Sequence, residues 1–308
     1  GVDSFEAVAV EGYGVTRGEW SASYGEKGIA RLKVDVFPYM GRAKVAEISP
    51  AMVLEVLRRI EARGVRETAH RALESCSQIM RYAVQTQRAI SDPCRDLKGA
   101  LLKPMAKHFP AITKPERLGD LLRASEGYAG SVVVRAALKL APMLMLRPGE
   151  LRHAQWHEFD LQASTWMVPA ARMKRTQDGK KNGDPHYVPL PIQAVTVLED
   201  LHHLTGHGLF VFMGERHHDR PMSENTVNAA LRAMGFANDE MTGHGFRATA
   251  RTLLHERLGI APEVIEAQLA HSVQDSLGRA YNRTEFIAQR KAMMQTLRWS
   301  NSRRHKDR

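Results

Sequence analysis

The sequence predicts a two-domain protein that is mainly α-helical and carries a small antiparallel β-sheet in its second domain. Three observations support this fold class. Apolar residues recur at three- and four-residue steps through much of the 308-residue chain, which is typical of amphipathic helices. Residues 98–119, rich in Pro, Lys and Gly, interrupt the helical pattern. Two β-branched and aromatic runs, STWMVP and PHYVPL, flank a polar insert, as in a β-hairpin.

The first domain is expected to be helical and to end near Lys107, which gives domains of residues 1–107 and 108–308. Ser49 followed by Pro50 predicts a capped helix start, and AMVLEVLRRIEAR continues it. A second helix is expected from about Arg66 to Ala89. Each arginine along these helices fits a solvated surface, but together they suit contacts to a phosphate backbone. These residues are Arg58, Arg59, Arg63, Arg71, Arg81 and Arg88.

The second domain is expected to alternate helices with the small sheet. Helices should begin near Leu118 and Val132, and Pro148 with Gly149 predicts a turn. The hairpin STWMVP–PHYVPL should enclose a long mobile loop, RTQDGKKNGD, and LFVFM is a candidate third strand. Further helices are expected in SENTVNAALRAMG with Ser223 as N-cap, after His244, and in APEVIEAQLA; the final RRHKDR reads as a disordered basic tail.

The composition favours a globular protein that binds a polyanion. The net charge is +10 and the isoelectric point near 9.7, which favours nucleic acid before an acidic membrane surface. Two cysteines, Cys76 and Cys94, cannot build a disulfide framework or a four-cysteine zinc site. The most apolar stretch is broken by charged residues and a proline, so no membrane span is expected. No signal peptide is expected either, and the missing initiator Met suggests a piece of a longer chain.

No cofactor is expected. GxxxxGK[ST] and GxGxxG are both absent, and no carboxylate cluster is spaced to hold magnesium. His202-His203 and His217-His218-Asp219 could bind zinc, but adjacent histidines without a partner at i+4 more often serve as polar loop residues.

Six residues in a fixed order stand out as candidates for chemistry. His244 and Arg247, three residues apart, fall on one helix face at the N-terminal end, where anions are favoured. Taken alone, each of the six fits an ordinary structural role. The set is Arg147, Lys174, His244, Arg247, His271 and Tyr281.

The motifs that contain these residues resemble the tyrosine site-specific recombinases, and most closely the prophage-type integrases. They are LMLRPGELR, HGFRATARTLL, QLAHS and RAYNR, with PMSENTVNAALRAMG and VPLP in support. FPYMGRAKVAEISPAMVLEVLRRIEARG and ETAHRALESCSQIMRYAV resemble the core-binding domain of that family. The resemblance covers nearly the whole chain and implies a helical core-binding domain followed by a catalytic domain.

The residue types suit phosphodiester chemistry without ATP. A tyrosine nucleophile conserves the bond energy as a phosphotyrosyl ester, and two guanidiniums match the charge that grows on the non-bridging oxygens. By resemblance, Tyr281 attacks and becomes linked to the 3′ phosphate, while Arg147 and Arg247 clamp the phosphate. The remaining roles follow in the same way: His244 assists proton transfer at the tyrosine, His271 hydrogen-bonds the phosphate, Lys174 protonates the 5′ oxygen, and Glu150 braces Arg147 or His244.

The chain departs from the family pattern at three places. The hairpin loop is long, which makes Lys180 and Lys181 rivals of Lys174. The further N-terminal domain that reads arm sites in this family does not appear in this sequence, because it was either removed or never present. The linker before the tyrosine, HSVQDSLGRAY, is less basic than expected.

The implied partner is double-stranded attachment-site DNA, bound by a homotetramer, with accessory DNA-bending or excision proteins and no membrane. The implied location is the bacterial cytoplasm, at the nucleoid. Two alternatives stay open. One is a type IB topoisomerase that relaxes DNA as a monomer, and the other is a catalytically silent DNA-binding regulator.

Overall fold

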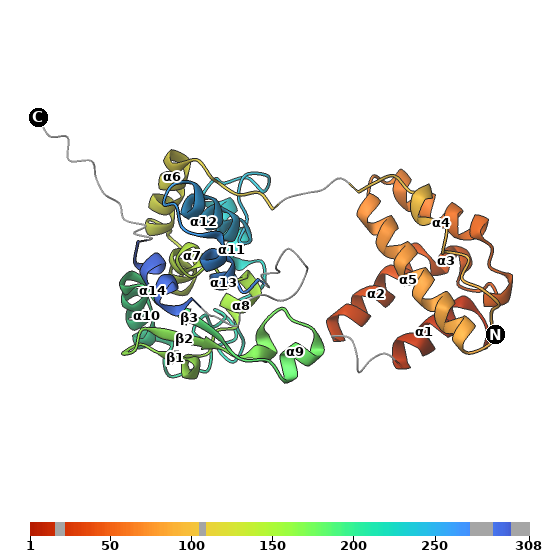
Figure 1. Ribbon diagram of the computed structural model, residues 1–308, viewed down its shortest axis with the longest axis horizontal. Helices are drawn as coiled ribbons and strands as arrows, with labels where there is room; N and C mark the ends of the chain where they lie inside the picture. Colours follow the sequence, from red (N-terminus) through yellow and green to blue (C-terminus); the bar gives the residue numbers. More distant parts are fainter. Residues whose placement is uncertain (16–21, 105–108, 272–285, 297–308) are drawn as a thin grey trace, which may run out of the picture. The chain divides into compact units, whose positions relative to one another are not determined.

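The chain folds into two compact units, Gly1–Lys107 and His108–Arg308 (Figure 1). A computed structural model describes residues 1–15, 22–104, 109–271 and 286–296. Each unit has its own hydrophobic core. Among the described residues, no helix has the length and apolar character needed to cross a bilayer.

The first unit is entirely helical in its described part. Ser49 accepts a hydrogen bond from the Met52 N–H and Pro50 occupies the first helical turn, which confirms the predicted helix start. The next helix ends earlier than predicted, because Thr86 bonds back to the Tyr82 carbonyl and Gln87 is left-handed. The helices are α1 (Phe5–Val15), α2 (Ala22–Asp35), α3 (Phe37–Met40), α4 (Pro50–Ala62) and α5 (Arg66–Gln85), with single 3-10 turns at Val45–Glu47 and Lys98–Ala100.

The core of the first unit joins side chains from all five of its described helices. Phe5 of α1, Leu32 of α2, Leu57 of α4 and Met80 of α5 are almost completely buried there. Burial of such side chains is the main stabilising contribution for a unit of this size. Cys76 and Cys94 are buried free thiols.

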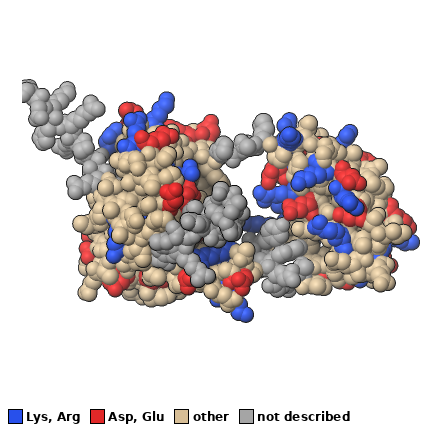
Figure 2. Space-filling model, in the orientation of Figure 1, with Lys and Arg blue, Asp and Glu red and all other residues tan. Residues whose placement is uncertain are grey.

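The arginines of the first unit are more often ion-paired than the sequence suggested. Arg59 bonds Glu55 at 2.7 Å and Arg71 bonds Glu67 at 2.8 Å, each across one helical turn. Arg63 and Arg88 also bind carboxylates. Lys and Arg therefore lie among Asp and Glu on the visible face of this unit (Figure 2).

The second unit packs its helices around α7. Its elements are α6 (Pro115–Glu126), α7 (Val132–Leu144), α8 (Pro148–Arg152), β1 (Phe159–Asp160), β2 (Thr165–Val168), α9 (Gln177–Lys181), β3 (His186–Pro189), α10 (Ile192–Thr205), α11 (Thr226–Ala233), α12 (Gly245–Glu256), α13 (Pro262–Gln268) and α14 (Ile287–Thr296). Single 3-10 turns lie at Trp156–Glu158 and Ala170–Arg172. Helix α7 is apolar on nearly all sides, as expected for a helix enclosed by others.

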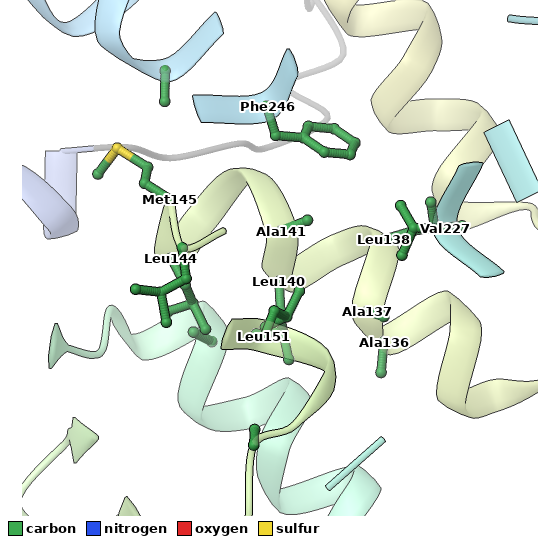
Figure 3. Close-up of a cluster of buried hydrophobic side chains, with 14 of the residues drawn as sticks. Ala136, Ala137, Leu138, Leu140, Ala141, Leu144, Met145, Leu151, Val227 and Phe246 are labelled. Carbon is green, nitrogen blue, oxygen red and sulfur yellow. The ribbon is translucent and has the colours of Figure 1, made fainter. Parts of the chain in front are cut away.

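The core around α7 fixes the positions of the helices that carry the candidate residues. Leu138 and Leu144 of α7 lie among side chains from α8, α11 and α12, including Leu151, Val227 and Phe246 (Figure 3). Helices α8 and α12 begin at two of the motifs singled out in the sequence. Packing on α7 therefore brings together segments that lie about a hundred residues apart.

The sheet is three-stranded and antiparallel, in the order β1-β2-β3. Trp166 of β2 is opposite Phe159 of β1 and Val188 of β3. The predicted hairpin pair is confirmed, but LFVFM is not the third strand. Phe210 and Met213 form only isolated bridges, and Phe159–Asp160 supplies the third strand.

Three further predictions differ from the structure in detail. The insert between β2 and β3 contains helix α9, capped by Thr176, rather than being all loop. The expected turn at Pro148 is the first turn of α8. Helix α11 begins after Asn225, because Ser223 bonds the Thr226 hydroxyl instead of capping the helix.

Candidate active site

Arg147 is positioned by the start of α8. It is the N-cap residue, Pro148 follows in the first turn, and Glu150 is in the third helical position. The Glu150 carboxylate accepts hydrogen bonds from the Arg147 backbone N–H at 3.0 Å and from its Nη1 at 2.8 Å. Glu150 is only 4% exposed. The sequence P-G-E thus builds half of a capping box whose carboxylate also holds the arginine side chain.

Arg247 lies in the first turns of α12 and is turned inward, 8% exposed, whereas His244 at the N-cap is exposed. Its Nη1 donates to the Met145 carbonyl at 2.6 Å and its Nη2 to the Leu269 carbonyl at 2.9 Å. Met145 and Leu269 are the C-caps of α7 and α13. The guanidinium therefore satisfies carbonyls at two helix C-termini, where positive charge is favoured.

Burial and the neighbouring Arg147 lower the pKa of Arg247 to about 10. Carboxylates of Glu150 and Glu266 oppose this shift. The two arginines are thus close enough to repel each other. Such a pair of cations favours binding of an anion that accepts hydrogen bonds from both guanidiniums.

His271 is held by the C-terminal turn of α13. Ala270 has a left-handed φ of 51°, its N–H donates to the Ala267 carbonyl, and the His271 N–H donates to the Glu266 carbonyl at 3.0 Å. These two bonds form a Schellman motif, with Ala270 in the position that usually requires glycine. The turn brings the imidazole back toward α12, where Arg247 Nη2 donates to its Nε2 at 2.9 Å.

Glu266 is a site residue that the sequence analysis missed. Its Oε2 lies 2.5 Å from His271 Nδ1, and its Oε1 accepts from Arg251 Nε at 2.6 Å. Since Nε2 of His271 accepts from Arg247, Nδ1 carries the proton that is donated to Glu266. Burial raises the pKa of Glu266, but the hydrogen bonds and charges of Arg251 and His271 together lower it by more. The five-residue separation of Glu266 and His271 did not predict this contact, because the contact depends on the left-handed turn at Ala270.

His244 stands at the N-cap of α12, where its ring stacks on Phe109. Although the His244 side chain is exposed overall, burial of part of its ring is the largest cause that lowers its pKa. Three cations lower the pKa further, and Glu150 raises it. The cations are Arg247, Lys174 and Arg147. These shifts favour the neutral imidazole, which is the form that can accept a proton.

Lys174 follows the 3-10 turn after β2 and is exposed. Its backbone N–H donates to Glu150 Oε1 at 3.4 Å, and its charge acts on His244. The rivals Lys180 and Lys181 lie on α9, and the contacts of the described residues link neither of them to the site. The geometry therefore favours Lys174 over both.

Arg172 connects the hairpin to the α8 turn. Its Nη2 binds the buried Glu158 carboxylate, and its Nη1 donates to the Glu150 carbonyl at 3.3 Å. Glu158 also accepts from the Trp166 indole at 2.9 Å. The strand that precedes Lys174 is thereby tied to the turn that carries Arg147. Neither charged residue was singled out in the sequence.

Tyr281 lies outside the described residues. Helix α14, which follows it, packs on β3 and α13 of its own chain, and Met293 and Met294 are buried there. Arg290, 2% exposed, donates to Gln268 Oε1 from Nε at 3.0 Å and from Nη2 at 2.9 Å. Helix α14 therefore docks on its own unit.

Within the described ranges, no three His, Cys, Asp or Glu side chains gather where they could share an ion. His202 packs edge-on against Trp156, with ring centroids 4.7 Å apart. The described site residues supply two guanidiniums, two imidazoles and a lysine, with the carboxylates of Glu150 and Glu266 beside them. Such a set of cations suits binding of a phosphate diester.

Two family matches together span most of the chain. Residues 5–100 match the phage integrase central domain, and residues 112–286 match the phage integrase family. The integrase of Enterobacteria phage P4 is 35% identical over 302 residues, which are 96% of this chain and 68% of that protein. Prophage integrase IntA of Escherichia coli K12 is 33% identical, over 95% of this chain and 68% of that one. The chain belongs to the phage integrase family of tyrosine recombinases, enzymes that cleave and rejoin DNA.

Solved structures share the fold at lower sequence identity. A lambda integrase (75–356) dimer bound to a COC′ core site has a TM-score of 0.69 at 16% identity, covering 91% of this chain and 99% of that one. A Tn1549 transposon integrase in complex with transposon right end DNA also has a TM-score of 0.69, at 15% identity, covering 88% and 92%. These likenesses support the two-domain recombinase fold.

Proposed function

We propose that this chain cleaves and rejoins attachment-site DNA to integrate or excise a mobile element, with Tyr281 as nucleophile. The phenol oxygen forms a bond to the scissile phosphorus while the bond to the 5′ oxygen breaks. His244 takes the phenol proton and Lys174 gives a proton to the leaving oxygen. The products are a 3′-phosphotyrosyl ester and a free 5′ hydroxyl, and the reverse reaction reseals the strand.

The observation that carries this proposal is the placement of Arg247 beside Arg147 and His271. Two guanidiniums and an imidazole converge from α8, α12 and the end of α13. The non-bridging oxygens of a phosphorane-like transition state carry charge that the fixed N–H donors of the two guanidiniums stabilise, typically by several kcal/mol. Glu150 keeps Arg147 in place during this step.

We also propose that residues 1–107 bind core-site DNA and residues 108–308 catalyse strand transfer. The expected assembly is a homotetramer on two DNA partners in the bacterial cytoplasm, assisted by DNA-bending or excision proteins. A lambda integrase tetramer bound to a Holliday junction, with a TM-score of 0.68 at 16% identity, supports this assembly by likeness of fold.

The test is covalent trapping. The chain is incubated with labelled attachment-site duplex that carries a nick near the cleavage point, and adducts are resolved on a denaturing gel and mapped by peptide. The expected result is an adduct at Tyr281 on a 3′ phosphate, absent from Tyr281→Phe although that variant still binds DNA. Tight binding without any adduct would favour a silent regulator. Relaxation of supercoiled plasmid without an attachment site would favour a topoisomerase.

A further inference from the structure

The segment that precedes α6 contacts the start of α12 through an aromatic ring. The Phe109 ring lies parallel to the His244 imidazole, with centroids 4.5 Å apart and an interplanar angle of 13°. Phe109 is 62% exposed, so core burial does not determine where its ring lies. Parallel stacking at this distance is a favourable arrangement for two aromatic rings.

A close backbone approach fixes this segment against α12. A Cβ atom on Gly245 would clash with the Pro110 carbonyl oxygen, far inside van der Waals contact. Only glycine at position 245 therefore allows Pro110 to lie where it does. Ile112, two residues further on, is 5% exposed and anchors the segment in the core around α7. The segment is thus held on both sides of Pro110.

We propose that Phe109 is a positioning residue that holds the His244 imidazole in one orientation and shields one of its faces from water. This inference rests on the proposed function, in which His244 accepts the proton of the tyrosine. Stacking removes rotational freedom of the imidazole before DNA arrives, so its nitrogens face the reaction without a further entropic cost. Phe109 acts through His244 and need not touch the phosphate.

Because His244 lies among charged groups, shielding of its ring from water affects its pKa. The charged groups that act on it come from three segments: Arg247 from α12, Arg147 and Glu150 from the α8 turn, and Lys174 from the segment after the 3-10 turn that follows β2. Burial is the largest cause that lowers the pKa of His244, ahead of the three cations. Removal of the Phe109 ring would hydrate the imidazole and favour its charged form.

The first test needs no DNA and uses the full chain. The ring protons of His244 are assigned by NMR through their loss in His244→Gln, and then titrated. In the native chain the Phe109 ring should shift them upfield. We expect Phe109→Ala to abolish that shift and to raise the pKa of His244, whereas Phe109→Tyr keeps both native values. Unchanged His244 shifts and titration in Phe109→Ala would overturn the proposal.

The second test measures cleavage. Single-turnover adduct formation on nicked attachment-site duplex is followed against pH. We expect Phe109→Ala to be at least about tenfold slower and its rise in rate to move to higher pH, with Phe109→Tyr close to native. Leu258→Ala, which removes another exposed apolar side chain of the same unit, is the control and should leave the profile unchanged. A loss of stability alone would lower the melting temperature without moving the pH profile.

The two tests separate this inference from the proposed function. If the native chain forms no adduct, the proposed function fails, while the NMR titration still decides whether Phe109 positions His244. If the native chain cleaves DNA and His244→Gln slows it, but Phe109→Ala cleaves like the native chain, only the role of Phe109 is wrong.

Discussion

Arg247 occupies a place where a guanidinium and an ammonium would behave differently. Its two Nη atoms reach carbonyls of separate helices, Met145 and Leu269, and a lysine could not span both. The same burial would also deprotonate part of a lysine, whose ordinary pKa is only about 10.4. We expect Arg247→Lys to slow adduct formation by about 10²- to 10³-fold while DNA binding is retained.

Single-turnover trapping and a binding titration on the same duplex measure the two effects of Arg247→Lys. Arg257→Lys is the matched control, because Arg257 follows the other end of α12 and is exposed. Near-native cleavage by Arg247→Lys would mean that the phosphate is held elsewhere.

The Glu266 carboxylate accepts hydrogen bonds from two donors through two different oxygens, whereas an amide has only one oxygen. Its two oxygens accept from Arg251 and from His271. In Glu266→Gln one of the two donors would face an NH₂ group. We expect cleavage to fall by about 10- to 100-fold, the range for loss of one hydrogen bond to a charged group. Glu263→Gln, on the exposed first turn of α13, should have no effect.

The pH dependence of stability gives Glu266 a second test. The pKa of this carboxyl is lowered in the folded chain, because the hydrogen bonds and charges of Arg251 and His271 together outweigh its burial. A lowered folded pKa adds stability that is complete above the unfolded value, about 4.3, and is lost as pH falls through the folded pKa. The unfolding free energy of the native chain minus that of Glu266→Gln should therefore shrink on acidification. A difference that stayed constant from about pH 7 to about pH 3 would contradict this assignment.

At the scale of an element, the end of α13 carries backbone strain. Ala270 adopts φ = 51° in the C′ position of the Schellman motif, where a Cβ costs roughly 1 kcal/mol. Ala270→Gly should stabilise the second unit by up to about 1 kcal/mol, because glycine adopts this conformation without a clash. Chemical denaturation measures the change. Ala267→Gly, inside the same helix, should instead destabilise by about 0.5–1 kcal/mol.

The elements that the sequence predicted well have strong local signals. Ser49-Pro50 and Pro262 sit at helix starts as expected, and the two main strands were recognised from their β-branched and aromatic residues. The third strand was misplaced because Phe159–Asp160 is only two residues long, whereas LFVFM is a longer apolar run in which only Val211 and Phe212 are buried. Local patterns do not distinguish a buried loop from a short strand.

The candidate site was predicted less completely than the fold. Motif spacing located Arg147, His244, Arg247 and His271, and the structure brings them together. Glu266 and Phe109 could not be found in that way, because their contacts depend on a left-handed turn and on a backbone approach to Gly245. Both features are tertiary, and no hydrophobic period or cap in the sequence marks them.

At the scale of the whole molecule, the net charge of +10 predicts that the affinity for DNA depends strongly on salt concentration. Each phosphate neutralised by Lys or Arg releases condensed counterions. If the chain makes roughly 6–10 such contacts, affinity should fall about 10³- to 10⁵-fold between about 50 and about 200 mM salt. A binding titration over that range measures the slope. A flat response would exclude backbone contacts as the main source of affinity.

Ion pairing within the first unit should determine which arginines contribute to the salt dependence of DNA binding. Among the described residues, no carboxylate lies within ion-pair distance of Arg58 or Arg81, and both are exposed. Arg59 and Arg71 each donate to a glutamate one turn away, and they would have to give up that bond to bind a phosphate. Near physiological salt, screening weakens long-range attraction between the protein and DNA, so direct contacts between arginines and phosphates dominate the electrostatic contribution to binding.

We therefore expect Arg58→Gln or Arg81→Gln to weaken DNA binding and to reduce the salt slope by about 1 for each phosphate that the variant no longer neutralises. The paired controls, Arg59→Gln and Arg71→Gln, should change the slope by less. Equal effects in all four variants would show that total charge, and not the availability of unpaired guanidiniums, controls DNA binding by this unit. A larger effect in the paired variants would mean that DNA displaces the glutamates, so that Glu55 and Glu67 compete with phosphate for the same donors.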